Sequence, residues 1–364
     1  MKNPFVTNGY VSPEYFCDRE KETAKIVSLL TNENNIALIS PRRLGKTDLL
    51  RHCFGQPEIK EHYHTFIIDI YATSSVRDFV NVFGKAVLDE LRPKGKSVWG
   101  TFLNVLASLR SEITFDMNGQ PTWGIGLGAI TNPSATLEPC LIAIDEFQQI
   151  TKYADDPNIE AALRTHIQRC SNAHFVFSGS HRHLMGAMFT SPARPFYQSV
   201  TLINLPPISV DKYAEFCLRH FERASKHLDT LVVTELYERF NGITSYMQKV
   251  MNILFSMTGT GEICIPSMID TAINDLLDFS ADTYDALLYQ MPEKQRIVFM
   301  AIAAEGKAKA ISSGDFVRKY KLQSASSVSS AVKGLLEKDF ITYDKGIYQV
   351  YDQFFQLWLQ RNKL

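Results

Sequence analysis

Short apolar runs alternate with amphipathic stretches over the first 205 residues of the chain. Runs of this length, bounded by polar turns, are typical of buried strands. Five strands are expected, at 35–39, 65–71, 140–144, 174–177 and 200–205. Apolar side chains at helical spacing predict helices at 20–30, 46–54, 76–91 and 157–170. This alternation favours an α/β fold, with a parallel sheet flanked by helices on both faces.

Other parts of the chain have different patterns. The stretch 94–139 is irregular, and within it only 122–130 alternates as a hairpin strand would. Beyond Pro207 the pattern is helical throughout, at 210–224, 229–240, 245–255 and 266–289. Pro292 opens a last segment with its own pattern. The sequence therefore predicts three domains: 1–206, 207–290 and 291–364.

The last segment has the pattern of a winged helix-turn-helix. Helices are expected at 292–303, 313–319 and 326–338, and a hairpin at 340–350 with Gly346 in its turn. Ser312 is the expected N-cap of the second helix. Winged helices often read DNA with the third helix. That helix would present Ser324, Ser326, Ser327, Ser330 and Lys333. One cation is less positive charge than a surface that binds DNA phosphates usually carries. A packing module is favoured, and DNA binding stays an alternative.

A phosphate-binding loop follows the strand at 35–39. The segment Ser40–Thr47 ends in Gly45-Lys46-Thr47 and precedes a predicted helix, the context that the G-x-x-x-x-G-K-[ST] motif requires. Backbone N–H groups at a helix N-terminus favour anions, the lysine neutralises phosphates, and the threonine hydroxyl binds Mg²⁺. Ser40 stands where the motif has its first glycine. The loop predicts a nucleoside triphosphate, ATP, bound with magnesium.

Two carboxylates end the strand at 140–144. Asp145 is expected to hold magnesium, and Glu146 to polarise the water that attacks the γ-phosphate. Ser178 and Ser180 end the next strand and could contact the γ-phosphate or the water, although an ordinary turn explains them equally well.

Three arginines are candidates for neutralising phosphate charge, Arg42 and Arg43 in the loop and Arg194 further along. Surface exposure is the default expectation for each of them.

Composition narrows the class of protein. The chain has 364 residues, of which 45% are hydrophobic, and this composition is typical of a globular protein. Its formal net charge is -1, so no overall electrostatic field attracts it to nucleic acid or to an anionic membrane. Six scattered cysteines without a C-x-x-C pair indicate reduced thiols. Neither a signal peptide nor a run of 18 apolar residues is found. We therefore expect a cytoplasmic protein.

Five segments resemble motifs of the archaeal-type ATPases of the STAND branch, within the AAA+-like P-loop ATPases. Tyr15–Glu20 resembles an F-x-G-R-E motif near the adenine, Pro41–Thr47 a P-R-R-x-G-K-T loop and Ile144–Gln148 an I-D-E-F-Q strand end. Gly179-Ser180 resembles a sensor, and Gly242–Gln248 the start of a lid helix. The resemblance covers nearly the whole chain. It implies ATP hydrolysis to ADP and phosphate, a helical lid over 207–290 and a C-terminal winged helix.

The chain departs from that family at a few positions. Asp18 replaces a glycine and Thr244 a proline, and Gln198-Ser199 stand where the family often has Gly-Arg, which leaves Arg194 as a substitute. The predicted nucleotide-binding residues are Ser40, Pro41, Arg42, Arg43, Leu44, Gly45, Lys46, Thr47, Asp48 and Arg19. The predicted catalytic residues are Glu146, Lys46, Ser180 and Arg194, and the predicted magnesium ligands are Thr47 and Asp145.

The favoured function is an ATP-driven switch in signalling or regulation, in which ATP closes the lid and hydrolysis reopens it. A protein partner or self-association would read the switch. The alternative is a DNA-binding regulator in which ATP gates the winged helix.

Overall fold

The computed structural model describes residues 2–91, 111–115, 121–125, 139–154, 156–168, 170 and 172–364. Within these ranges the chain divides into two compact units. The first unit comprises Met1–His220 and Asn241–Lys249, and the second comprises Phe221–Phe240 and Val250–Leu364. The predicted helical domain, 207–290, contributes segments to both units, so its independence stays a prediction.

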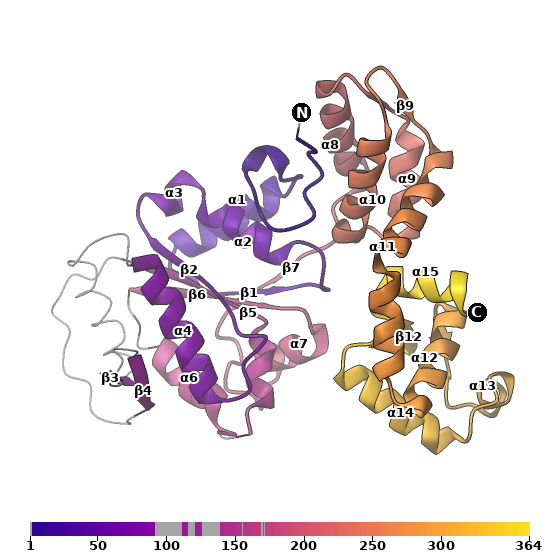
Figure 1. Cartoon of the computed structure of the whole chain (residues 1–364). Coiled ribbons are helices and arrows are strands. Elements are labelled where there is room, and N and C mark those ends of the chain that lie inside the picture. Colours follow the sequence, from indigo (N-terminus) through magenta and orange to yellow (C-terminus); the bar gives the residue numbers. More distant parts are fainter. Residues whose placement is uncertain are drawn as a thin grey trace. The chain divides into compact units, whose positions relative to one another are not determined.

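A parallel sheet forms the centre of the first unit (Figure 1). Among the described residues it has five strands in the order β2-β5-β6-β1-β7, and all neighbours pair in parallel. The strands are β1 (Ile36–Ile39), β2 (His64–Asp69), β5 (Cys140–Asp145), β6 (Ala173–Gly179) and β7 (Thr201–Asn204). They fall on the five apolar runs of the sequence. The predicted α/β fold class is confirmed.

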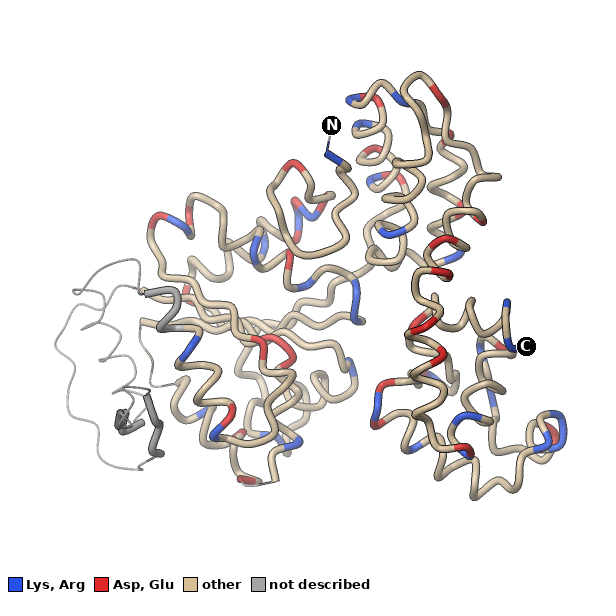
Figure 2. Tube along the Cα trace, viewed as in Figure 1, with Lys and Arg blue, Asp and Glu red and all other residues tan. Residues whose placement is uncertain are grey.

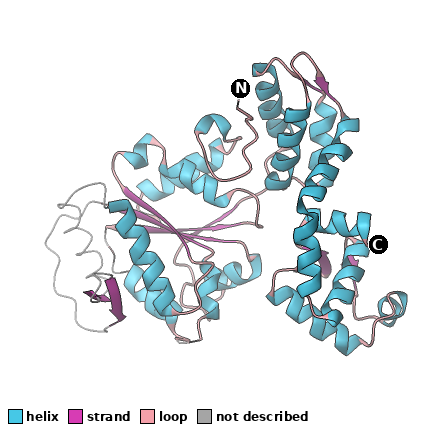
Figure 3. Ribbon diagram, in the orientation of Figure 1, coloured by secondary structure: helices cyan, strands magenta, loops and turns pink. Residues whose placement is uncertain are grey.

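Alternating side chains of β1 supply two cores. Ile36 and Leu38 pack in the core under α1, α2 and α3, whereas Ala37 and Ile39 pack in the core under α4, α6 and α7. The helices are α1 (Glu20–Thr31), α2 (Lys46–Phe54), α3 (Pro57–Lys60), α4 (Val76–Leu91), α6 (Ile159–Ile167) and α7 (Arg182–Thr190). Figure 3 shows helices covering both faces of the sheet. Because both faces are covered, β1 and β5 are buried along their whole length, whereas the edge strands β2 and β7 are buried only in part.

A separate antiparallel pair consists of β3 (Ser111–Phe115) and β4 (Pro121–Ile125). The hairpin strand predicted at 122–130 coincides with β4 up to Ile125, and 126–130 lie outside the described residues. Most of the irregular stretch at 94–139 lies outside them as well.

The helical region contains α8 (Val210–Arg223), α9 (Thr230–Arg239), α10 (Thr244–Met257) and α11 (Ile269–Gln290). The single helix predicted at 266–289 begins instead with a short 3-10 turn, η4 (Pro266–Met268), which has the proline in its first turn. The short strands β8 (His227–Leu228) and β9 (Ile263–Cys264) pair in parallel.

Three helices and a small antiparallel sheet follow. The helices are α12 (Glu293–Glu305), α13 (Gly314–Lys319) and α14 (Ala325–Glu337). In the described chain the sheet has the order β10-β12-β11, formed by β10 (Ala308–Lys309), β11 (Ile341–Asp344) and β12 (Ile347–Val350). The N-cap of α13 is Ser313, whose side chain accepts from Phe316 N, and not the predicted Ser312. The Ser312 hydroxyl lies 3.4 Å from that of Ser329 instead.

The apolar C-terminal tail forms α15 (Gln353–Asn362), which is capped by Asp352. Phe355 and Trp358 are buried there, and the Phe355 ring stacks on Tyr284 of α11 at 4.6 Å between centroids. All six cysteines lie in the described part of the chain, outside any disulfide. No helix in the described part of the chain is long and apolar enough to cross a membrane.

Candidate nucleotide-binding site

The loop between β1 and α2 turns at two residues in the left-handed region. Arg43 has φ 70° and Gly45 has φ 81°. A Cβ on Gly45 would meet nothing within 4 Å, so glycine is needed there for its conformation and not for space. Ser40 continues the sheet, with its N–H donating to Gly179 O at 3.4 Å, and its φ is not positive. Serine therefore replaces the first glycine of the motif without strain.

Lys46 opens α2 and lies almost entirely inside the loop, with 6% of its surface exposed. Its Nζ donates to Ser40 O at 3.3 Å and to Pro41 O at 3.4 Å. Burial lowers the pKa of the Lys46 ammonium, and the carboxylates of Glu146 and Asp145 oppose that shift. A buried cation with only carbonyl partners in the loop is well placed to meet a phosphate.

Thr47 meets the acidic end of β5. Its Oγ1 donates to Asp145 Oδ2 at 2.5 Å, although the two residues are far apart in the sequence. Asp145 is buried, and its other oxygen accepts from Glu146 N at 3.0 Å. A hydroxyl and a carboxylate held together at the loop are oxygen ligands of the kind that Mg²⁺ prefers.

Glu146 follows with a left-handed backbone, φ 55°. Its Oε2 accepts from Ser180 Oγ at 2.8 Å and from Gln148 Nε2 at 2.5 Å. Ser180 comes from the end of β6, and Gln148 from the 3-10 helix η3 (Phe147–Lys152). The carboxylate is thus oriented by two donors from different elements. Sequence reasoning assigned no role to Gln148, which appeared only inside the resemblance to an I-D-E-F-Q strand end.

The loop arginines point in different directions. Arg42 Nε donates to Ser180 Oγ at 3.1 Å and lies 3.9 Å from Glu146 Oε1. The Arg43 guanidinium donates to the Tyr246 hydroxyl and lies over that ring, while Arg43 O accepts from Ser245 N at 3.2 Å. Arg42 therefore faces the carboxylate, and Arg43 faces the start of α10.

Arg194 is held elsewhere. Its guanidinium donates to Glu160 of α6, and it is not among the residues that line the pocket described below. The structure thus brings Ser180 to Glu146 but does not bring Arg194 to the loop.

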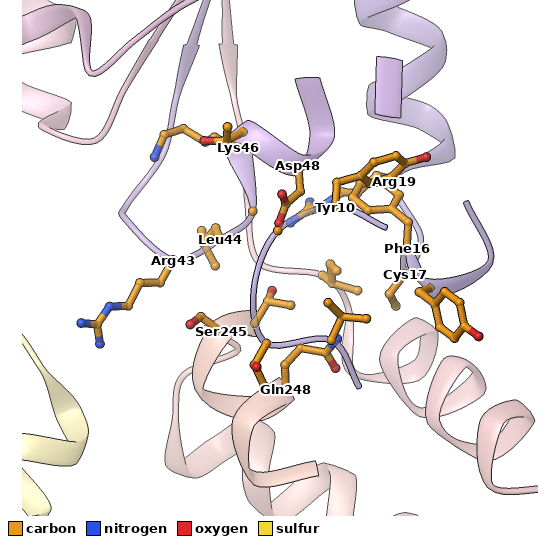
Figure 4. A pocket seen from close by; sticks show the side chains of 18 of the residues that line it. Tyr10, Phe16, Cys17, Arg19, Arg43, Leu44, Lys46, Asp48, Ser245 and Gln248 are labelled. Atoms are coloured by element: carbon orange, nitrogen blue, oxygen red, sulfur yellow. The ribbon is translucent and has the colours of Figure 1, made fainter. Parts of the chain in front are cut away.

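A cavity of about 320 Å³ opens beside the loop (Figure 4). Its lining includes the loop from Arg42 to Asp48, together with Glu146 and Arg19. The rest of the wall comes from an N-terminal segment that includes Val6, Tyr10, Val11, Tyr15, Phe16 and Cys17, from Ile208 and from Thr244, Ser245 and Gln248. One end is thus cationic and rich in backbone N–H groups, and the other is largely apolar. This division suits a nucleotide, with phosphates at the loop and a base among the aromatic side chains.

Arg19 is a buried donor beside this cavity. It has φ 78° and is 3% exposed, and its Nη1 donates to Glu22 Oε1 at 2.8 Å. Its Nη2 is buried and has no hydrogen-bond partner among the described residues. Because an unsatisfied buried donor is costly, this atom fits a ligand acceptor.

Sequence reasoning missed most of the apolar wall. Phe16 stacks on His52 of α2 at 4.4 Å between centroids, and Tyr10 OH lies 3.0 Å from His52 Nδ1. These contacts fix the N-terminal segment against α2. The signal available in the sequence was the resemblance of Tyr15–Glu20 to a motif near the adenine, which did not reach Tyr10.

Comparisons with known proteins agree with this architecture. A family model described as "Probable winged helix domain" matches residues 282–361. A comparison with curated proteins finds no match. The Walker-type ATPase PABY2304 of Pyrococcus abyssi is similar in structure, with a TM-score of 0.62, 15% identity and coverage of 98% of this chain and 99% of that one.

Two proteins of Aeropyrum pernix are also similar. The ORC1 protein, solved in complex with DNA, gives a TM-score of 0.58 at 13% identity, covering 99% of this chain and 97% of that one. The ORC2 protein in its ADP form gives a TM-score of 0.50 at 13% identity, with 98% and 96% covered. At these identities the likeness concerns the fold. The chain has the fold of a Walker-type AAA+ P-loop ATPase with a C-terminal winged helix domain.

Proposed function

We propose that this protein binds ATP with magnesium and hydrolyses it, and that the nucleotide state acts as a switch. The observation that carries the proposal is the contact between Thr47 and Asp145, with Glu146 next in the chain and Lys46 buried in the same loop. These groups would supply what phosphoryl transfer needs: a cation for the phosphates, two oxygen ligands for a metal and an adjacent carboxylate.

The side chains present fit magnesium rather than a metal held by protein alone. The described residues contain no group of three or more His, Cys, Asp or Glu that could hold a metal ion. Mg²⁺ is commonly held by one or two protein oxygens, substrate phosphates and water, which matches Thr47 and Asp145. When bound, magnesium would neutralise charge on the phosphate oxygens.

Glu146 would act as the general base for hydrolysis. Its carboxylate is held by Ser180 and Gln148, so it can accept a proton from a water molecule in a fixed orientation. Arg42, beside Ser180 and Glu146, is the arginine best placed to meet charge that develops on the γ-phosphate. The pair with Glu160 would have to open before Arg194 could do the same.

The start of α10 supports the proposed switch. Arg43 contacts Ser245 through its carbonyl and Tyr246 through its guanidinium. A nucleotide that rearranges the loop would therefore move the start of α10, the helix that continues into the second unit. The same proposal includes closure of a lid and membership of the STAND branch. It also includes recognition of the nucleotide state by a protein partner or by a second copy of this chain.

The experiment is a calorimetric titration of the full chain with ATP and magnesium. It is followed by measurement of phosphate release and by size determination with and without nucleotide. Micromolar binding, slow release of phosphate and a nucleotide-dependent change in size are expected. Absence of ATP binding would refute the proposal, and binding without hydrolysis would reduce it to a binding switch or to an ATPase that needs a partner.

A DNA-binding regulator is the second candidate. The match of 282–361 to a winged helix domain favours it, and the similar ORC1 protein was solved with DNA. A gel shift on duplex DNA with and without ATP, repeated at several salt concentrations, separates the two functions. A shift that appears only with ATP would support the regulator.

A further inference from the structure

Gln248 lines the pocket on the side opposite the N-terminal segment. It lies in the second turn of α10, and Figure 4 shows it next to Ser245, with Cys17 across the cavity and Lys46 far off at the loop. The loop would take the phosphates, so Gln248 lies toward the end of the cavity left for sugar and base. Most side chains at that end are apolar or aromatic. The carboxamide of Gln248 shares that wall with other hydrogen-bonding side chains, namely Thr7, Tyr10, Tyr15, Arg19, Thr244 and Ser245.

Tyr213 fixes this amide from behind. The hydroxyl of Tyr213, on α8, donates to Gln248 Oε1 at 2.8 Å, and Tyr213 is 1% exposed. Burial raises the pKa of the Tyr213 phenol well above its usual range, so it stays protonated and remains a donor. Because Oε1 already accepts this bond, the group that Gln248 can turn toward a ligand is its Nε2 amide, which only donates.

We propose that Gln248 determines base specificity, its Nε2 donating a hydrogen bond to an unprotonated ring nitrogen of the adenine of ATP. The inference rests on the proposed binding of ATP. Apolar walls hold any flat ring about equally well, so they discriminate poorly between bases. A fixed donor discriminates strongly, because a base without an acceptor at that point leaves a desolvated N–H unpaired.

The test uses the full chain and four nucleotides: ATP and its 1-deaza, 3-deaza and 7-deaza analogues. Each analogue replaces one ring nitrogen by C–H and keeps the triphosphate and sugar. With the wild type, one analogue should bind about tenfold more weakly than ATP, the usual effect of one lost hydrogen bond in a desolvated site. Gln248→Met removes the Nε2 donor and keeps a side chain of similar length. In that variant ATP should weaken by a similar factor, and the selected analogue should weaken no further.

A matched control is Gln290→Met, which makes the same change at an exposed position at the end of α11. It should leave all four affinities unchanged. If Gln248→Met folds poorly, Gln248→Asn gives the same comparison, because the shorter side chain withdraws the amide from the base. Tyr213→Phe should reduce discrimination in part, since it only frees the orientation of the amide.

Several outcomes would overturn the inference. One is equal binding of all four nucleotides by the wild type, and another is an unchanged ratio of ATP to each analogue in the Gln248 variants. Another outcome is that Gln248→Met weakens ATP binding and 2′-deoxy-ATP binds the wild type more weakly by the same factor, while all three deaza analogues bind as ATP does. This outcome would show that the amide binds the sugar. A lower melting temperature without a change in these ratios would show that Gln248 only joins α8 to α10. Failure of the wild type to bind ATP would instead refute the proposed function.

Discussion

Lys46 is the residue whose removal should be most costly. Lys46→Ala deletes the buried ammonium that faces the loop, and the phosphates lose their main point cation. We expect ATP binding to fall below detection in a calorimetric titration. The control is Lys25→Ala on the exposed side of α1, which should bind ATP as the wild type does. Unchanged affinity in Lys46→Ala would show that the loop does not hold the phosphates.

Glu146 is a second residue whose substitution tests the site, and its substitution should affect hydrolysis and not binding. Glu146→Gln keeps the size of the side chain and removes its basicity, so ATP should still bind while phosphate release slows by roughly 10²-fold or more. The comparison is a titration and a turnover assay on the same preparation. Glu58→Gln, an exposed position on α3, is the control. Turnover at the wild-type rate in Glu146→Gln would mean that another group activates the water.

At the scale of the element, β6 and η3 meet so closely that only a glycine fits at Gly179. A Cβ there would lie 2.5 Å from Met185 Sδ and closer still to Gln148 Oε1, and both neighbours are buried. Gly179→Ala should therefore lower the free energy of unfolding by about 1–3 kcal/mol, the usual cost of overpacking. It should also slow hydrolysis, because Gln148 holds Glu146. Chemical denaturation and the turnover assay measure the two effects.

Gly186 provides the matched control on the neighbouring helix α7. A Cβ there would meet nothing within 4 Å. Gly186→Ala should stabilise the protein by about 0.5–1 kcal/mol, because alanine loses less backbone entropy than glycine in a helix. The same effect of both alanines on stability would show that a Cβ fits at Gly179 without displacing Gln148 or Met185.

At the scale of the whole molecule, the charges of the winged helix domain decide between the two candidate functions. Figure 2 shows Lys and Arg interspersed with Asp and Glu along this part of the trace. Lys319 pairs with Glu305 at 2.6 Å, Arg318 with Asp315 at 2.5 Å, and Lys333 of α14 lies 3.9 Å from Glu337. These three cations already face carboxylates and would neutralise few phosphates, and each neutralised phosphate adds to affinity and to the salt slope.

We therefore expect the full chain to bind random duplex DNA weakly or not at all near physiological salt, with or without ATP. Fluorescence anisotropy across a salt series measures this. The control is the same titration with unlabelled competitor duplex, which separates binding from adsorption. Submicromolar affinity at about 150 mM salt with a steep slope would place the DNA-binding regulator first.

Much of the fold was predictable because its signals are local. Short apolar runs between helical stretches predicted the five strands of the sheet, since strands covered on both faces need apolar side chains throughout. The Gly45-Lys46-Thr47 sequence and the Asp145-Glu146 strand end predicted the loop side of the candidate site for a similar reason. Both are strand-to-turn segments, and parallel strands bring their carboxyl ends to one edge of a sheet.

The sequence by itself thus determined the α/β class, the loop and the residues at the ends of its strands. The tertiary structure decided which distant side chains meet there. It joined Thr47 to Asp145, Ser180 and Gln148 to Glu146, and Tyr213 to Gln248, and it paired Arg194 with Glu160. Such contacts depend on chain crossings and packing between elements, which leave no periodic mark along the chain. The apolar end of the pocket is of the same kind, because its walls come from the N-terminal segment, Ile208 and α10.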